Sequence, residues 1–199
     1  MAFGGSDQVS DTPVVPTSLK IVVAGGFGVG KTTLVNSVSE IPPLRTEEVL
    51  TEASVGVDDM AGIESKETTT VALDFGRITI NPQVVLYLFG TPGQNRFWFM
   101  WDELASGALG AIVLVDTRRL DSSFPSIDFF ERRDIPFVIA VNGFDGSFDH
   151  TIDEVRQALD VDTGVPIITC DARRRESSKE VLVELVQYTM TKLRERTPA

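Results

Sequence analysis

From Leu19 onward, short runs of apolar, mostly β-branched residues alternate with longer stretches of helical periodicity. The runs are nearly continuous in apolar residues, which is typical of strands that helices cover on both faces. Most runs are separated by enough chain for a helical crossover, so we expect most strands to be parallel. The predicted strands are Leu19–Ala24, Val71–Ile80, Val84–Phe89, Ala111–Asp116, Pro136–Asn142 and Pro166–Cys170.

The second and third of these strands are an exception to the parallel arrangement. Only Asn81-Pro82-Gln83 separates them, which predicts a hairpin. The pattern as a whole therefore predicts a three-layer α/β fold, with a mostly parallel six-stranded sheet and one antiparallel hairpin strand. Helices are expected at Thr33–Ser39, after the capping-box pairs Thr151/Glu154 and Ser177/Glu180, and along the stripe Leu182, Leu185, Val186, Thr189, Met190 and Leu193.

Composition narrows the class of protein further. The chain has 199 residues, of which 42% are hydrophobic and 24% charged, so we expect one globular domain over residues 18–196 after a disordered tail at 1–17. Lys and Arg number 18 against 29 Asp and Glu, and a net charge of −11 argues against nucleic-acid or anionic-membrane binding. A single cysteine, Cys170, excludes an internal disulfide. With no apolar leader or membrane-length run, we expect a cytoplasmic location.

The strongest chemical signal follows the first predicted strand. The segment from Gly25 to Thr32 reads GGFGVGKT, which matches GxxxxGK[ST] and leads into a predicted helix. Glycines allow a tight turn whose N–H groups face phosphate oxygens, Lys31 supplies a charge for the β- and γ-phosphates, and the Thr32 hydroxyl binds Mg²⁺. The sequence therefore predicts a nucleoside triphosphate site with Gly26, Phe27, Gly28, Val29, Gly30, Lys31, Thr32 and Thr33 around the phosphates.

Two later strands also end in polar residues. One ends in Asn142-Gly143-Phe144-Asp145, and the next in Asp171-Ala172-Arg173. Because ligands of such folds bind beyond the carboxyl ends of the strands, a nucleotide base is expected between these two segments. Taken alone, Asn-x-x-Asp is a weak signal and usually marks only a turn.

With these motifs the chain resembles Ras/Rab-type small GTPases, and among them bacterial members encoded beside roadblock-type proteins. Asn142-x-x-Asp145 is similar to the family's NKxD motif, and Thr70-Val71-Ala72-Leu73-Asp74-Phe75 resembles its TIGVDF segment. Gly90-Thr91-Pro92-Gly93-Gln94-Asn95-Arg96-Phe97 resembles its DTAGQERF segment. The resemblance covers most of the chain and implies a G domain that binds GTP and GDP with Mg²⁺.

The resemblance also implies roles for single residues. Asp145 would accept two hydrogen bonds from guanine, Asn142 would tie this loop to the phosphate loop, and the Ala172 N–H would meet guanine O6. Gly143, Asp171 and Arg173 would complete the base site. In the switch segments, Thr70 would bind Mg²⁺ and the γ-phosphate, Gly93 would donate its N–H to the γ-phosphate, and Gln94 would orient the attacking water.

Three positions depart from the family pattern. Gly90 replaces the Asp that holds Mg²⁺ through water, and Phe27 replaces a glycine that leaves room for a catalytic arginine and the glutamine. Gly143 replaces the lysine whose stem covers the base, so Phe144 or Arg173 is the candidate cover. Nucleotide binding is therefore a firmer expectation than fast hydrolysis.

Partners are expected at the switch segments. The stretch Ile41–Glu67 is long for a connection and predicts a mobile switch with a short helix near Thr46–Thr51. Within it, Arg45 is either a solvated arginine or an internal arginine finger. The aromatic segment Phe97–Trp101 is either core or an anchor for an effector or a roadblock-type regulator.

Two other functions stay open at this point. A nucleotide-gated module that does not hydrolyse GTP would suit Phe27 and Gly90. A P-loop kinase for a small metabolite would need a lid with catalytic arginines and would leave Asn142 and Asp145 without a role.

Overall fold

The computed structural model describes residues 15–42, 44–51, 68–93, 99–146 and 148–196; for 44–51, 68–72 and 145 it describes the backbone alone. Over these residues the chain forms one seven-stranded sheet in the order β2-β3-β4-β1-β5-β6-β7. Strands β1, β4, β5, β6 and β7 run parallel to one another, whereas β3 runs antiparallel to both β2 and β4. The strands are β1 Thr17–Gly25, β2 Leu44–Thr51, β3 Thr68–Asn81, β4 Val84–Gly90, β5 Gly110–Val115, β6 Phe137–Asn142 and β7 Ile167–Cys170.

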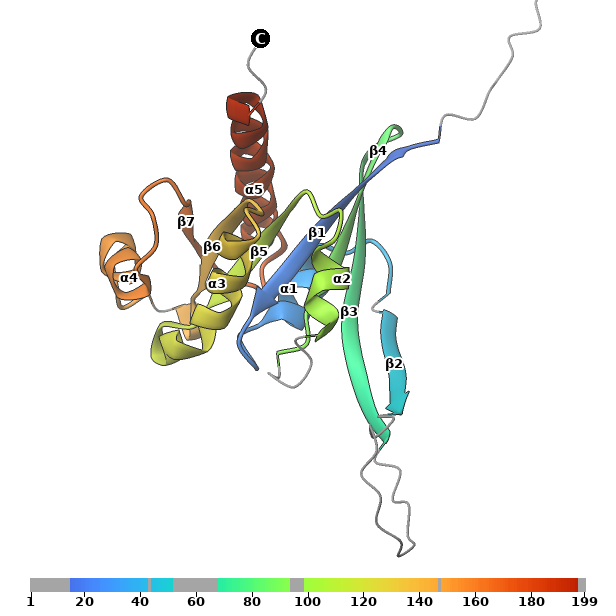
Figure 1. Cartoon of the computed structure of the whole chain (residues 1–199), viewed down its shortest axis with the longest axis horizontal. Coiled ribbons are helices and arrows are strands. Elements are labelled where there is room, and N and C mark those ends of the chain that lie inside the picture. Colours follow the sequence, from blue (N-terminus) through green and yellow to red (C-terminus); the bar gives the residue numbers. More distant parts are fainter. Residues whose placement is uncertain (1–14, 43, 52–67, 94–98, 147, 197–199) are drawn as a thin grey trace, which may run out of the picture.

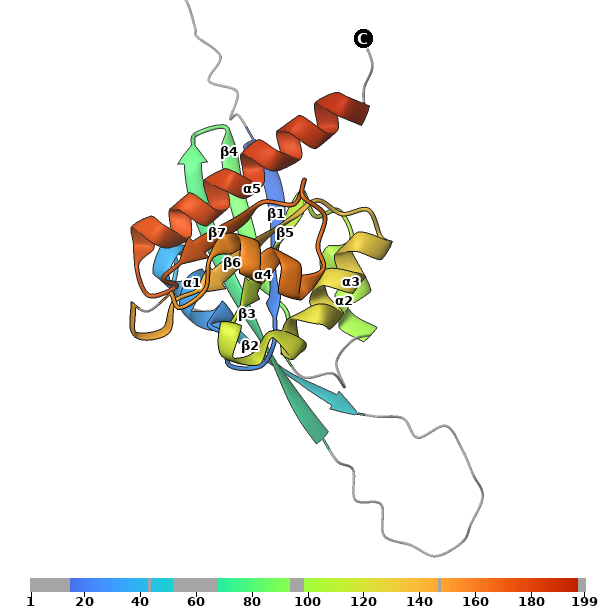
Figure 2. The same cartoon turned by 90° about the vertical axis from the view of Figure 1, so that its left-hand side faces the viewer.

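Helices cover both faces of the sheet, as Figures 1 and 2 show. Side chains of α2, α3 and α4 pack on one face, and side chains of α1 and α5 pack on the other. Among the described helices, none is long and apolar enough to cross a membrane. The helices are α1 Lys31–Val38, α2 Trp101–Ala105, α3 Phe124–Arg132, α4 Ile152–Leu159 and α5 Arg175–Arg196, with 3₁₀ turns η2 at Thr117–Ser123 and η3 at Phe144–Gly146.

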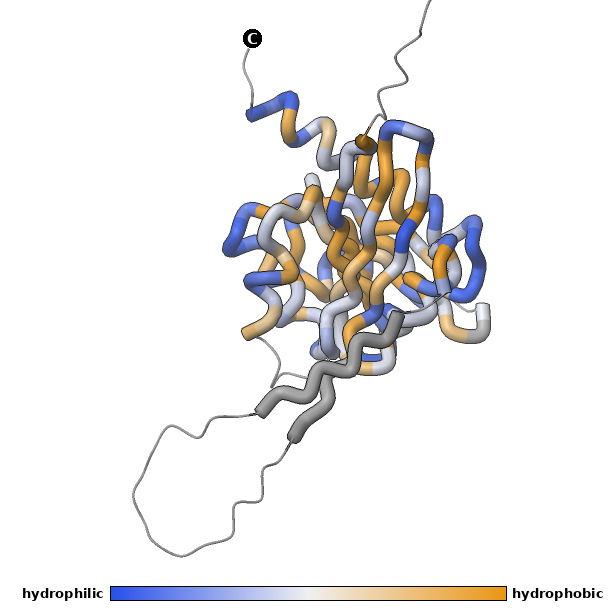
Figure 3. The backbone as a smooth tube through the Cα atoms, turned by 90° about the vertical axis from the view of Figure 1, so that its right-hand side faces the viewer, coloured by the Kyte–Doolittle hydropathy of each residue, from blue (hydrophilic) through white to orange (hydrophobic). Residues whose placement is uncertain are grey.

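The alternation of side chains along each central strand explains the two cores. In β1, Val22 and Ala24 face the α2–α4 layer, while Ile21 and Val23 face α1 and α5. Apolar residues run along these inner strands, whereas polar residues collect toward the outer helices and turns (Figure 3). The predicted three-layer α/β fold is confirmed, including the β3–β4 hairpin around Asn81-Pro82-Gln83.

The sheet has one strand more than the six expected. Residues 44–51 form β2, which pairs along its whole length with β3, so the short helix predicted near Thr46–Thr51 is wrong. The segment LRTEEVLT carries charges that suit an exposed edge strand, and the ladder to β3 satisfies its backbone groups. In Figure 1 the β2–β3 ribbon extends beyond the rest of the sheet.

Of the two predicted capping boxes, the one at Thr151 and Glu154 is confirmed and the one at Ser177 and Glu180 is wrong. Thr151 and Glu154 form a complete capping box at the start of α4. Ser177, in contrast, lies inside α5, which begins at Arg175, and its hydroxyl accepts a hydrogen bond from the Asp171 N–H. The predicted apolar stripe of α5 is also shorter than expected, because Met190 and Leu193 lie exposed near the end of the helix.

Candidate nucleotide-binding site

The phosphate loop joins β1, which ends at Gly25, to α1, which begins at Lys31. Gly30 caps the helix in a left-handed conformation, with φ at 108°, and a Cβ there would lie 2.7 Å from Asn142 Nδ2. Glycine is therefore required at this position both by the backbone and by the close approach of another loop. The first N–H groups of α1 have no acceptor within the helix, and N–H groups in this position commonly bind anions.

Lys31 is folded onto this loop. Its Nζ donates hydrogen bonds to the carbonyl oxygens of Gly25 (2.8 Å) and Gly26 (2.7 Å), and the side chain is only 7% exposed. Burial lowers the Lys31 pKa to about 8, against a smaller opposing effect of the Asp74 carboxylate. The lysine charge is thus held beside the loop at a cost that an anionic ligand would offset.

The turn η2 supports the phosphate loop from outside. A Cβ on Gly26 would lie 2.3 Å from Ser122 Oγ, so the two segments are in direct contact. Arg119 Nη2 donates to the Phe27 carbonyl oxygen at 3.3 Å and pairs with the buried Asp116 carboxylate at 3.5 Å. Hydrogen bonds from Arg118 keep the Asp116 pKa below its usual value, so this carboxylate stays charged.

Asn142 connects three loops at the carboxyl ends of the parallel strands. Its Nδ2 donates to the Val29 carbonyl oxygen (2.9 Å), and its Oδ1 accepts from the Ala172 N–H (3.1 Å). The contact to the phosphate loop has the geometry that the resemblance implies. The Ala172 N–H, in contrast, was expected to face the base and donates to Asn142.

The rest of the predicted base site lies around this amide. Gly143 follows Asn142 and donates its N–H to the Cys170 carbonyl oxygen at 2.7 Å, which joins the ends of β6 and β7. The backbone of Asp145 lies in η3, two residues further on. Asp171 accepts hydrogen bonds from the N–H and the guanidinium of Arg173, which keep the pKa of Asp171 below its usual value.

The structure places beside Thr32, the predicted Mg²⁺ ligand, a carboxylate that the sequence did not single out. Thr32 Oγ1 donates to Asp74 Oδ2 at 2.6 Å. Asp74 pairs with Gly90 across β3 and β4, and a Cβ on Gly90 would lie 2.8 Å from the Asp74 Cβ. The Asp74 carboxylate therefore occupies the space beside Gly90 in which the aspartate of the small GTPases that the chain resembles would begin. The sequence signal for Asp74 is its place in the segment that resembles the Rab-type TIGVDF motif.

The predicted switch residues fall into three groups. A Cβ on Gly93 would lie 2.8 Å from Lys31 Nζ and 2.9 Å from the Phe27 Cα, so Gly93 abuts the phosphate loop. Thr70 lies in β3 four residues before Asp74, a strand rise of about 13 Å. The β2–β3 ribbon thus carries Thr70 away from Thr32. Gln94 lies outside the described residues.

The aromatic segment after the switch is divided between core and surface. Trp101 is buried against Phe129 and Phe130, whereas Phe99 is 62% exposed. Residues 94–98 lie outside the described part of the chain. The side chain of Arg45 also lies outside it, so both predicted roles of Arg45, solvated arginine and internal arginine finger, stay predictions.

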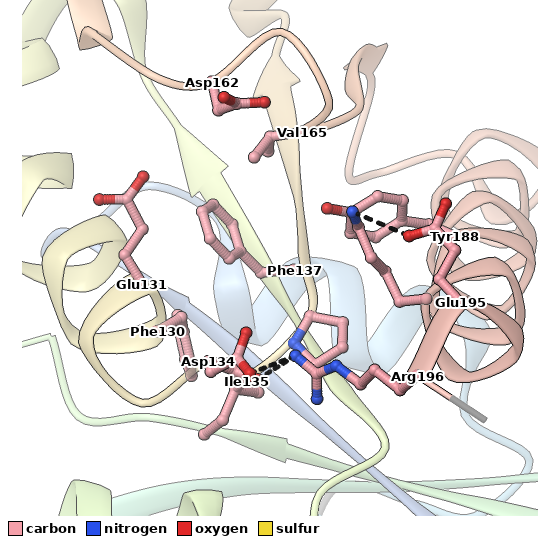
Figure 4. Close-up of a pocket in the computed structure, with 12 residues that line it drawn as sticks. Phe130, Glu131, Asp134, Ile135, Phe137, Asp162, Val165, Tyr188, Glu195 and Arg196 are labelled. Atoms are coloured by element: carbon pink, nitrogen blue, oxygen red, sulfur yellow. Dashed lines mark hydrogen bonds and ion pairs between the residues drawn. The ribbon is translucent and has the colours of Figure 1, made fainter. Parts of the chain in front are cut away.

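A separate pocket of about 510 Å³ lies at the other end of the molecule. Its walls come from the segments that precede β6 and β7 and from the end of α5, including Asp134, Asp162 and Glu195 (Figure 4). These are the amino ends of the strands, so the pocket is not part of the site around Lys31.

The fold and the loop at Lys31 define this chain as a P-loop nucleotide-binding protein with a G-domain-like architecture. It belongs to the family described as "Conserved hypothetical ATP binding protein", whose model matches residues 23–192. An uncharacterized protein of Methanocaldococcus jannaschii is 32% identical over 129 residues, which cover 64% of this chain and 71% of that protein.

Solved structures show the same fold at low sequence identity. The G domain of the T. maritima FeoB iron transporter superposes with a TM-score of 0.59 at 19% identity, covering 86% of this chain and 99% of that one. The FeoB G domain from Methanococcus jannaschii gives a TM-score of 0.57 at 14% identity, covering 87% and 98%.

Proposed function

We propose that residues 18–196 form a Ras-like G domain, which binds GTP and hydrolyses it to GDP and so acts as a molecular switch. The observation that carries this proposal is the Asn142 amide, which hydrogen-bonds the phosphate loop and the loop after β7 at once. Asp145 follows on the same segment, so one nucleotide could reach both Lys31 and Asp145. A carboxylate there accepts hydrogen bonds from guanine, whereas adenine would leave buried groups unpaired, a loss worth about 10⁴- to 10⁵-fold in such sites.

Mg²⁺ fits the oxygen ligands beside the phosphate loop. The Thr32 hydroxyl and the Asp74 carboxylate lie 2.6 Å apart, and both are ligand types that Mg²⁺ prefers. In this proposal Thr32 binds the ion directly, and Asp74 takes the place of the aspartate that Gly90 lacks. The ion would neutralise charge on the β- and γ-phosphates. Thr70 would join it when the switch segment closes.

Hydrolysis would depend on Gly93, which lies beside Lys31, and on Gln94. In our proposal Gly93 donates its N–H to the γ-phosphate and Gln94 orients the attacking water. The Phe27 ring is 68% exposed at the top of the same loop, where it would restrict the approach of an arginine from a partner. We therefore expect slow turnover by the protein alone.

We also propose that partners read the state of the switch segments. The buried Trp101 fixes α2 to the core, while Phe99 next to it is exposed to a partner. An effector or a roadblock-type regulator would contact this aromatic segment and the β2–β3 ribbon in the GTP-bound state.

Identifying the nucleotide that co-purifies with the protein, followed by a binding panel of GTP, ATP and XTP, tests the proposal. Asp145→Asn is expected to reduce GTP affinity and to shift preference toward xanthosine nucleotides. Single-turnover assays of wild type, Phe27→Gly and Gln94→Ala then measure hydrolysis.

Each result of these assays assigns the function differently. Preference for ATP, which the family description favours, would overturn the guanine assignment and revive the kinase alternative. GTP binding without phosphate release, with or without a partner, would instead identify a module gated by nucleotide alone. Undiminished GTP affinity in Asp145→Asn would contradict the role of this carboxylate.

A further inference from the structure

An aromatic ring covers the glycine at the centre of the candidate base site. A Cβ on Gly143 would lie 2.5 Å from Phe148 Cζ, 2.7 Å from Cε1 and 3.0 Å from Cε2. Atoms cannot approach this closely, so the Phe148 ring fills the space that any side chain at position 143 would occupy. The ring is nevertheless 45% exposed, because only part of it rests on the glycine.

The position of Gly143 gives this contact its chemical meaning. The residue follows Asn142, and its N–H bonds the Cys170 carbonyl oxygen, so it lies where the loops after β6 and β7 meet. In the small GTPases that the chain resembles, a lysine stem at this position lies over the base. Phe148 thus presents an apolar, half-exposed surface at the place from which that stem is missing.

Phe144 and Arg173, the two residues expected from the sequence to cover the base, make other contacts. The guanidinium of Arg118 lies over the Phe144 ring, 4.0 Å from its centre. Arg173 pairs with Asp171 at 2.9 Å. Among the aromatic side chains of residues 143–148, Phe148 is therefore the one that lies over Gly143.

We propose that Phe148 is the residue on which the purine of the bound nucleotide stacks. This inference rests on the nucleotide site proposed above and adds a residue to it. Base–aromatic stacking tolerates every base, since each has a π-face. Phe148 therefore contributes affinity for a nucleobase of any kind, whereas the choice between guanine and adenine belongs to Asp145.

The central experiment compares ligands with and without a base. Dissociation constants for GTP, ATP and inorganic tripolyphosphate, all with Mg²⁺, are measured for wild type, Phe148→Ala and the control Phe124→Ala. Phe124 is a similarly exposed phenylalanine at the start of α3. Phe148→Ala is expected to weaken GTP and ATP by the same factor, about 5- to 100-fold, and to leave tripolyphosphate unchanged. Phe124→Ala is expected to change none of the three.

A rescue variant separates stacking from a structural role. Gly143 is not among the glycines with positive φ, so its backbone accepts a side chain once the ring is removed. Gly143→Lys in the Phe148→Ala background should therefore restore most of the lost GTP affinity. Gly143→Lys alone should displace the Phe148 ring. In Phe148→Trp, GTP should quench the emission of the new tryptophan, and tripolyphosphate should not.

The outcomes distinguish this inference from the function on which it rests. Wild-type GTP affinity in Phe148→Ala, or an equal loss for tripolyphosphate, would overturn the stacking role and leave the nucleotide site standing. If the wild-type protein bound tripolyphosphate but gained nothing from any base, both the stacking role and the proposed GTP switch would be overturned.

Discussion

The buried position of Lys31 predicts that nucleotide affinity depends on pH. Burial lowers the pKa of this lysine from 10.5 to about 8, which corresponds to about 3 kcal/mol of unfavourable free energy for the charged form. A triphosphate binds the charged form, and its negative charge raises the lysine pKa again in the complex. We therefore expect GTP affinity to fall about tenfold between pH 7 and pH 9, because only about one lysine in eleven is charged in the free protein at pH 9.

Isothermal titration calorimetry measures this coupling directly. At pH 8, binding should take up about half a proton per nucleotide, seen as a dependence of the heat on the ionisation enthalpy of the buffer. The phosphates themselves contribute little there, since their second pKa is about 6. Lys31→Gln should bind more weakly and lose the proton uptake, whereas Lys179→Gln, a change at an exposed lysine on α5, should retain it.

The lowered pKa of Lys31 has the opposite effect on the stability of the free protein, which should increase with pH. Between pH 8 and 10.5 the unfolded chain holds more protons on this lysine than the folded chain, so the unfolding free energy gains a contribution from Lys31 as the pH rises. Lys31→Gln should lack that contribution. Constant GTP affinity from pH 7 to pH 9, together with no proton uptake at pH 8, would refute the assignment of Lys31 as a buried, ligand-pairing lysine.

Two further predictions concern contacts of the site. Asp74→Asn should raise the Mg²⁺ concentration needed to retain GTP by about 10- to 100-fold, and combining Asp74→Gly, which removes the Cβ that crowds position 90, with Gly90→Asp should restore it; an unchanged Mg²⁺ requirement in Asp74→Asn would contradict the role of this carboxylate. Gly30→Ala should lower the unfolding free energy by about 2–3 kcal/mol in chemical denaturation, because its Cβ would meet Asn142 and its φ is 108°. Gly107→Ala, with φ at 69° and open space around it, should cost only about 1 kcal/mol; equal losses in the two variants would show that the Asn142 contact is unimportant.

The core strands could be predicted because burial on both faces requires apolar residues along the whole strand, and these are visible in the sequence. A strand buried on both faces must be apolar along its length, and β5 and β6 are buried at every position. The strand β2 could not be found in this way. Its residues are mixed in polarity, and it forms a strand because it pairs with β3 along its whole length. This pairing depends on β3 and cannot be deduced from the residues of β2 alone.

The sequence predicts the phosphate loop but not the position of Asp74 beside Gly90, because that position depends on the register of the β3–β4 hairpin. Counting back from the pair Asn81–Val84 at the turn would place Gly90 opposite Phe75. A bulge between Thr79 and Asn81 shifts the register by one residue, so that Asp74 faces Gly90. Because a one-residue shift exchanges the two faces of a strand, the bulge decides whether a carboxylate or a phenyl ring approaches Thr32.

At two of the three departures from the small-GTPase pattern, another side chain occupies the vacated space. At Gly90 and at Gly143 the side chain of the small GTPases is absent, and in each case another side chain lies within 3 Å of where a Cβ would be, Asp74 at 2.8 Å and Phe148 at 2.5 Å. Each glycine is therefore part of a pair, since the replacement side chain could not fit beside a larger residue. The third departure, Phe27, adds an exposed ring instead of removing a side chain. If the proposed function holds, differences from the small GTPases that the chain resembles should therefore appear in hydrolysis and its activation by partners rather than in nucleotide binding.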